Sequence, residues 1–260
     1  MSHPILFVGA GPGDPELITV KGQGALKEAD VIIYAGSLVP KRMLKWARPD
    51  ATLINSASMN LEEIIIQIEK SYNEDKLVVR LHTGDPSLYG AIFEQIATLE
   101  KKMIPCKVIP GVTAAFAAAA SMGLEYTLPK VSQTLILTRV SGRTPVPQSE
   151  ELEHLAKHQS SMAIYLSMGL MEKTSKILTN AYGKDAPCVI AYRVSQPDEK
   201  IIHTTVGELF HTAKEKNIYR QAIIIVGKVL EVTSDSLIWK SKLYDKDFSH
   251  GYRNDKKDER

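Results

Sequence analysis

Short apolar runs alternate along this chain with stretches in which apolar residues recur every three or four positions. In the first half, the runs that predict β-strands are residues 5–8, 31–34, 52–54, 77–81 and 107–109. Helical spacing connects Leu61, Ile64, Ile65 and Ile68, and again Leu88, Ile92, Ile96 and Leu99. Alternating strands and helices predict a mainly parallel sheet covered by helices.

The pattern breaks between Gly123 and Lys130, and a second series of elements follows. Strands are predicted at residues 134–137, 162–166, 188–192, 201–206 and 222–226, with helices around 150–158, 169–180 and 207–216. Only residues 195–198 separate two of these strands, which predicts a hairpin and therefore a mixed second sheet. The fold class is thus α/β in two domains, residues 1–123 and 130–232. The polar tail 233–260 ends in mixed charges, and we expect its end to be disordered.

A turn dense in glycine follows the first strand. It reads Gly9-Ala10-Gly11-Pro12-Gly13-Asp14-Pro15, and glycines let the backbone approach a ligand without an intervening Cβ. Asp14 stands where a dinucleotide fingerprint requires its third glycine, and no Gly-Lys-Ser/Thr follows. A tight turn without any ligand remains an alternative interpretation.

Two later strands end in similar loops. His82-Thr83-Gly84-Asp85-Pro86 follows one of them, and Pro110-Gly111-Val112-Thr113 follows the other. Asp14 and Asp85 each precede a proline, so helix capping alone explains both pairs. Because ligands of parallel sheets bind outside the carboxyl ends of the strands, the three loops predict a shared site for a polar ligand of nucleoside size.

Composition narrows the class of protein. The 260 residues are 44% hydrophobic, and 32 basic against 30 acidic residues give a net charge of +2, which predicts neither a nucleic-acid nor a membrane partner. Cys106 and Cys188 lie far apart without clustered histidines, so no protein-bound metal is expected. The absence of a leader or an apolar run of about 20 residues predicts a cytoplasmic protein.

The sequence motifs of several other reaction classes are absent from this chain. The chain carries no Gly-x-Ser-x-Gly elbow and no His-Glu-x-x-His zinc site, so hydrolysis is not supported. A Rossmann-type methyltransferase would end its second strand in an acid, whereas this strand ends Tyr34-Ala35-Gly36-Ser37. A nucleotide-binding module without catalytic activity remains an alternative interpretation.

Four motifs together resemble the tetrapyrrole methyltransferases, which use S-adenosylmethionine to methylate carbon atoms of corrin and sirohaem precursors. They are residues 8–15, 17–22, 82–90 and 110–114, in the order that the family shows, and the resemblance extends from about Ile5 to Gly227. It implies two α/β domains with S-adenosylmethionine in the cleft between them, and a homodimer.

Local segments resemble one subgroup most, namely the enzymes that methylate cobalt-precorrin-4 at carbon 11. These segments are residues 35–39, His82-Thr83, 137–139, 142–147 and 197–200. The substrate expected from this resemblance is a tetrapyrrole of the cobalt-precorrin type. Uroporphyrinogen-III methylation and diphthine synthesis are the alternatives within the family.

The family's site residues carry over position by position. The resemblance implies cofactor contacts at Pro12, Thr83, Gly84, Asp85, Leu88, Thr113, Ala114, Leu166, Val194 and Ala222, the last three expected from the second domain. Arg139 and Arg143, beside the domain junction, are our candidates for binding the substrate's carboxylates. His82 or Asp85 is a candidate proton acceptor. Because the sulfonium is already a good leaving group, alignment is expected to matter more than a covalent catalyst.

Overall fold

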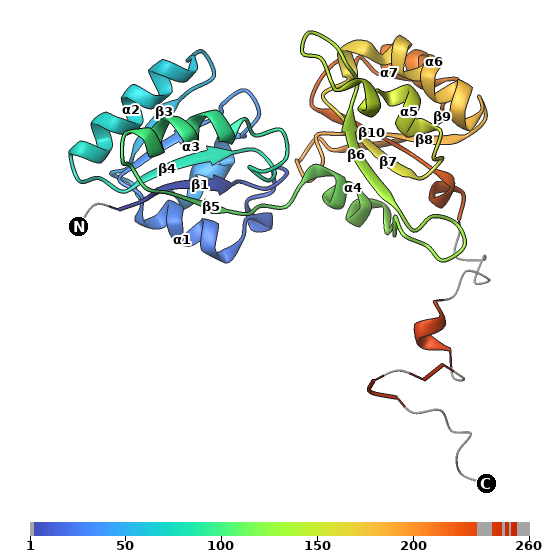
Figure 1. Ribbon diagram of the computed structural model, residues 1–260, viewed down its shortest axis with the longest axis horizontal. Helices are drawn as coiled ribbons and strands as arrows, with labels where there is room; N and C mark the ends of the chain where they lie inside the picture. Colours follow the sequence, from blue (N-terminus) through green and yellow to red (C-terminus); the bar gives the residue numbers. More distant parts are fainter. Residues whose placement is uncertain (1–2, 233–240, 246–247, 250, 254–260) are drawn as a thin grey trace. The chain divides into compact units, whose positions relative to one another are not determined.

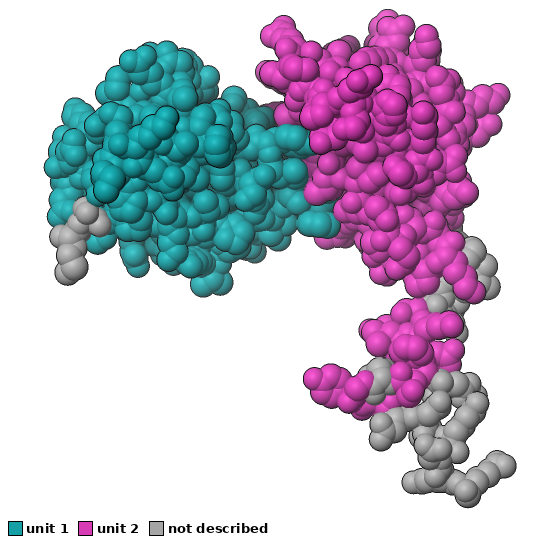
Figure 2. All heavy atoms as spheres, viewed as in Figure 1, with its two compact units in different colours: residues 1–118, 193–199 teal, residues 119–192, 200–260 magenta. Residues whose placement is uncertain are grey.

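The computed structural model describes residues 3–232, 241–245, 248–249 and 251–253. The chain divides into two compact units: unit 1 is Met1–Ala118 with Arg193–Glu199, and unit 2 is Ala119–Tyr192 with Lys200–Arg260 (Figure 2). The division falls inside helix α4 (Ala114–Met122), a few residues before the sequence-predicted end at 123. The prediction of a disordered end concerns residues 254–260, which lie outside the described residues.

Unit 1 is built on a parallel sheet. Its strands are β1 (Ile5–Gly9), β2 (Val31–Tyr34), β3 (Thr52–Asn55), β4 (Val78–His82) and β5 (Cys106–Ile109), in the order β3-β2-β4-β1-β5 (Figure 1). Every pairing among these strands is parallel, which confirms the sequence-based prediction. Parallel pairing needs a crossover between consecutive strands, and the helices supply it.

Helices cover both faces of this sheet, and alternate residues of each strand pack against one face or the other. Helix α1 (Val20–Glu28) covers one face, where Leu26 packs with Val8. Helices α2 (Leu61–Asn73) and α3 (Ile92–Lys101) cover the opposite face, where Phe7 belongs to their core (Figure 1). Each fully buried apolar side chain of this kind contributes about 1.5–3 kcal/mol to folding.

Helix α3 begins later than its spacing predicts. Helical spacing places Leu88 in the helix with Ile92, but Leu88 lies in a turn closed by its N–H and the carbonyl of Asp85, 3.2 Å apart. Tyr89 and Ala91 have φ angles of 57° and 49°, which take the backbone out of the helical region. The helix-cap prediction is therefore wrong for Asp85.

The capping prediction holds at Asp14. Its carboxylate accepts a hydrogen bond from the N–H of Glu16, 2.9 Å away, and Pro15 opens a short 3₁₀ helix (Pro15–Leu17). Proline fits this first position because its missing N–H would have no partner there. In both loops the aspartate accepts the N–H two residues on, but a 3₁₀ helix follows Asp14 and only a turn follows Asp85.

Unit 2 contains a mixed sheet, as the sequence predicts. Its strands are β6 (Leu135–Arg139), β7 (Ser161–Tyr165), β8 (Pro187–Tyr192), β9 (Lys200–Thr205) and β10 (Ala222–Val226), in the order β6-β7-β10-β8-β9. Strands β6 and β7 are parallel and the other pairs antiparallel, with β8 and β9 forming the predicted hairpin. Helices α5 (Leu152–Ala156), α6 (Met171–Tyr182) and α7 (Leu209–Glu215) bury Leu152, Leu178 and Leu209 in the unit's core. Among all described helices, none is long and apolar enough to cross a membrane.

Candidate functional site

Three loops meet at the carboxyl edge of the parallel sheet in unit 1. Strand β1 lies between β4 and β5, so the glycine loop (residues 9–14) lies between the aspartate loop (83–91) and the proline loop (110–113). The register pairs Gly9 with His82 and Val8 with Ile109, which brings the three strand ends level. This edge is where ligands of open α/β sheets bind.

Glycines let these loops approach one another at backbone distance. A Cβ added at Gly9 would lie 2.6 Å from the Cα of Gly111, and one at Gly111 would lie 2.1 Å from the carbonyl oxygen of Gly84. Gly11 and Gly84 exchange two hydrogen bonds, of 3.2 and 2.8 Å, as an isolated antiparallel bridge. Glycine is therefore required here by the packing of backbone on backbone.

The Asp85 carboxylate connects two of the loops. One oxygen accepts the N–H of Ser87 at 2.8 Å, and the other accepts the N–H of Gly111 at 2.9 Å. Hydrogen bonds to a charged acceptor are stronger than neutral ones. Asp85 thus holds the proline loop against the aspartate loop, a partner that the sequence did not reveal.

Space remains open beside Gly84. A Cβ added there would meet only the Cα of Thr113, at 3.8 Å, although a φ of +60° still favours glycine. Thr83, Gly84 and Asp85 are half-buried around this space, while Pro12 is buried. Main-chain atoms and partly exposed polar groups therefore adjoin open space here, and such groups can fix the orientation of a polar ligand.

His82 is buried at the end of β4 among neutral and cationic neighbours. Its ring stacks on Phe7 at 5.9 Å between centroids, and its Nε2 atom has no partner among the described residues. Arg80, also buried, donates to the side chain of Gln95 and to the carbonyl of Ile33. Burial, followed by the charge of Arg80, lowers the pKa of His82 to about 3. Burial also lowers the pKa of Arg80 to about 10.

This buried histidine makes folding stability depend on pH. Because its pKa falls from 6.5 to about 3 on folding, the unfolded chain binds the proton first as the pH drops. Stability is then lost between those values, by about 1.4 kcal/mol per pH unit. Urea unfolding at pH 7, 6, 5 and 4 should show this slope reduced in His82→Leu and unchanged in the exposed-site control His203→Gln. Equal slopes in His82→Leu and the wild type would contradict the assignment.

In unit 2, the predicted residues gather at one edge of the mixed sheet. Arg139 pairs with Tyr165, the residue before Leu166, and Ala222 pairs with Tyr192 at the end of β8. Leu166 is 64% exposed, with a φ of 52° that turns the chain sharply after β7. The guanidinium of Arg139 donates to the carbonyls of Thr144 and Pro145, whereas Arg143 is exposed. Arg139 therefore shapes the loop that presents Arg143.

Val194 lies in a different unit from the one predicted. The sequence placed it in the second domain, but the tip Arg193–Glu199 of the β8–β9 hairpin is part of unit 1. Val194 itself is 4% exposed. A turn between two strands gives no signal of what it packs against, so the sequence could not reveal this placement.

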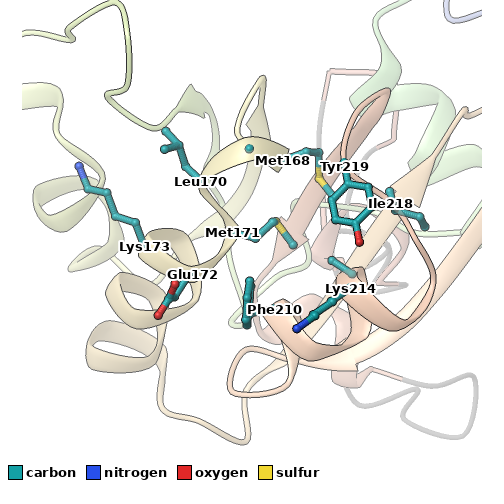
Figure 3. Close-up of a pocket in the computed structure, with 11 residues that line it drawn as sticks. Met168, Leu170, Met171, Glu172, Lys173, Phe210, Lys214, Ile218 and Tyr219 are labelled. Atoms are coloured by element: carbon teal, nitrogen blue, oxygen red, sulfur yellow. The ribbon is translucent and has the colours of Figure 1, made fainter.

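A separate cavity of about 490 Å³ lies within unit 2 (Figure 3). Leu170, Met171, Phe210 and Ile218 give it an apolar lining, and charged side chains such as Lys214 also line it. None of the predicted cofactor or substrate residues lines this cavity. The glycine-lined edge of unit 1 is the better candidate site, because the backbone groups and the carboxylate converge there.

Comparison with known proteins identifies the family. The sequence profile of the Tetrapyrrole (Corrin/Porphyrin) Methylases matches residues 4–209. The chain belongs to this family. A tetrapyrrole methylase of Methanocaldococcus jannaschii named cobalt-precorrin-4 C(11)-methyltransferase is 51% identical over 253 residues, covering 97% of this chain and 96% of the relative.

Solved structures of tetrapyrrole methylases share the fold. A cobalamin biosynthetic enzyme, cobalt precorrin-4 methyltransferase, aligns with a TM-score of 0.85 at 45% identity, over 87% of this chain and 95% of the other. Uroporphyrin-III C-methyltransferase from Thermus thermophilus, complexed with S-adenosylhomocysteine, aligns with a TM-score of 0.73 at 26% identity, over 89% and 100% of the two chains.

Proposed function

We propose that this tetrapyrrole methylase transfers a methyl group from S-adenosylmethionine to carbon 11 of cobalt-precorrin-4, in cobalamin biosynthesis. The observation that carries the proposal is the 51% identity, over nearly the whole chain, to an enzyme of that name. The glycine-lined edge of unit 1 supports it, because the edge suits a nucleoside-sized cofactor.

The proposed cofactor contacts are the residues that the family resemblance implies. In unit 1 they are Pro12, Thr83, Gly84, Asp85, Leu88, Thr113, Ala114 and Val194, and in unit 2 they are Leu166 and Ala222. S-adenosylmethionine would supply an electrophilic methyl group, and its sulfur would leave as the neutral thioether of S-adenosylhomocysteine. A backbone contact suits positions such as Gly84, where the open space adjoins main-chain atoms.

The protein's contribution to the reaction is positioning. Both oxygens of Asp85 already accept backbone hydrogen bonds, and the ring of His82 is buried against Phe7. In place of the proton-acceptor role considered from sequence, we therefore assign Asp85 to holding the loops together and His82 to packing against Phe7. Correct placement of two reactants can by itself supply several kcal/mol of the barrier.

Arg143 is our candidate for a carboxylate of the tetrapyrrole. It is exposed, and the loop that carries it is held by Arg139. Exposed ion pairs contribute little, so Arg143→Ala should raise KM for the tetrapyrrole only about two- to fivefold and leave the Kd for S-adenosylhomocysteine unchanged. Steady-state kinetics measures this KM. The control is Lys157→Ala, which removes another exposed cation of unit 2. An unchanged KM would remove Arg143 from the substrate site.

We further propose that the protein is a cytoplasmic homodimer, as the family resemblance implies. Sedimentation equilibrium of the purified chain, whose mass is 28.8 kDa, tests the oligomeric state. A mass of twice this value is expected, and a monomer at micromolar concentration would contradict the homodimer.

Mass spectrometry of the reaction tests the function. Purified protein is incubated with S-adenosylmethionine and either cobalt-precorrin-4 or uroporphyrinogen III. One added methyl group on the precorrin alone, with release of S-adenosylhomocysteine, is expected. Methylation of uroporphyrinogen would favour the alternative enzyme of the family, and cofactor binding without transfer to either would favour a non-catalytic module.

A further inference from the structure

The tip of the β8–β9 hairpin packs against the glycine loop. This tip, Arg193–Glu199, belongs to unit 1, while the strands on either side of it belong to unit 2. The sequence predicted a hairpin turn here, with Val194 as a cofactor contact and residues 197–200 resembling the subgroup, but it did not show what the tip packs against. Its contacts connect it to the far end of the loop that holds Pro12.

The hairpin tip is braced internally. The Arg193 guanidinium donates to the side-chain oxygen of Gln196 at 3.0 Å and pairs with the Asp198 carboxylate at 2.9 Å. The N–H of Ser195 donates to the Glu199 carboxylate. Arg193 and Ser195 have φ angles of 45° and 64°, a conformation that persists only when surrounding contacts enforce it. These contacts hold Ser195 in a defined place.

Ser195 contacts two other segments of unit 1, each through a different atom. Its hydroxyl oxygen accepts the N–H of Asp14 at 2.9 Å, and its carbonyl accepts a hydrogen bond from the Arg42 guanidinium at 2.8 Å. Gly13 allows this approach, because a Cβ there would lie 2.6 Å from the side chain of Gln196. The tip and the loop are therefore complementary in shape as well as hydrogen-bonded.

The two ends of the glycine loop have different anchors. At the near end, Ala10 donates to the carbonyl of His82, and Gly11 is bridged to Gly84. At the far end, the Asp14 N–H is held by the Ser195 hydroxyl. Pro12 lies between the anchors and has no N–H of its own to fix it.

We infer that Ser195 is a positioning residue for the cofactor: its hydroxyl fixes the far end of the glycine loop and so places Pro12 for contact with S-adenosylmethionine. This inference rests on the proposed function. Loss of one net hydrogen bond predicts that Ser195→Ala weakens S-adenosylhomocysteine binding about two- to tenfold. At saturating cofactor, kcat should stay near the wild-type value, because the hydroxyl acts on the loop and not on the reacting atoms.

Substitutions at this position separate the hydroxyl from the backbone conformation. Ser195→Gly removes the hydroxyl, but glycine suits the positive φ. This variant should therefore fold well and yet bind S-adenosylhomocysteine more weakly than the wild type. Ser195→Asn tolerates the same φ and offers a carbonyl oxygen to Asp14, so it should restore part of the affinity. Ser149→Ala, at an exposed serine of unit 2, is the matched control and should bind like the wild type.

Isothermal titration with S-adenosylhomocysteine, together with hydrogen exchange of the segment 9–17, tests the inference. We expect weaker binding and faster exchange in Ser195→Ala and Ser195→Gly, with recovery in Ser195→Asn. Wild-type affinity for S-adenosylhomocysteine in both Ser195→Ala and Ser195→Gly would overturn the inference. It would also be overturned if affinity across the variants followed their thermal stability and not the presence of a side-chain acceptor for the Asp14 N–H. A wild-type protein that binds no S-adenosylhomocysteine would instead overturn the proposed function, and this inference with it.

Discussion

Replacing Gly111 by alanine is expected to weaken S-adenosylhomocysteine binding about 100-fold and to lower the free energy of unfolding by about 3 kcal/mol. The new Cβ would lie 2.1 Å from the carbonyl oxygen of Gly84 and 2.8 Å from the Cα of Gly9. Both neighbours are backbone atoms, so no side chain can rotate away and the three loops must separate. Calorimetric titration and urea unfolding measure the two effects.

Gly24 provides the matched control. It lies inside helix α1 of the same unit, and a Cβ there would meet nothing within 4 Å. Gly24→Ala should leave binding unchanged and stabilise the protein by about 0.5–1 kcal/mol, because alanine favours the helix. If Gly111→Ala bound S-adenosylhomocysteine as tightly as Gly24→Ala, close packing of the loops would not be what forms the site.

Replacing Asp85 by alanine is expected to weaken S-adenosylhomocysteine binding about 30-fold. The carboxylate joins the N–H groups of Ser87 and Gly111, and each hydrogen bond to a charged group contributes about 1.5–3 kcal/mol. The affinity of Asp85→Asn for S-adenosylhomocysteine should lie between those of the wild type and Asp85→Ala, because its single amide oxygen can replace only one of the two carboxylate oxygens. Titration calorimetry of the three proteins gives the order.

Asp30 is the control for this substitution. Its carboxylate also joins distant segments of unit 1, accepting the N–H of Leu77 at 2.8 Å and pairing with Arg48 at 3.1 Å. It precedes β2, at the opposite edge of the sheet from the three loops. Asp30→Ala should therefore lower stability without changing affinity. Equal losses of affinity in both variants would mean that general stability, and not the connection between loops, sets the binding.

The strands of both sheets were predictable because buried strands consist of short runs of apolar residues, which are visible in the sequence. The predicted bounds of Val31–Tyr34 and Ala222–Val226 match the observed ones, since short apolar runs bounded by polar residues are typical of buried strands. The four-residue connection between two runs likewise required a hairpin, and with it a mixed sheet. The meeting of the three loops followed from parallel strands sharing one carboxyl edge.

Features that depend on a single backbone angle or a distant partner were not predictable. Leu88 has helical spacing with Ile92, but the left-handed Ala91 between them begins a new segment, and alanine carries no signal for that conformation. The contacts from Asp85 to Gly111 and from Asp14 to Ser195 join residues 26 and 181 positions apart. The sequence pattern shows which face of an element is buried. It does not show which distant N–H group will donate a hydrogen bond to a given side-chain oxygen.

The most direct test of the proposed reaction is to find the carbon atom that receives the methyl group. Cobalt-precorrin-4 is incubated with the protein and S-adenosylmethionine labelled with carbon-13 in its methyl group, and the product is analysed by NMR. We predict a single labelled methyl group bound to carbon 11. A label on any other ring carbon, or its appearance only when uroporphyrinogen III is the substrate, would contradict the proposed function.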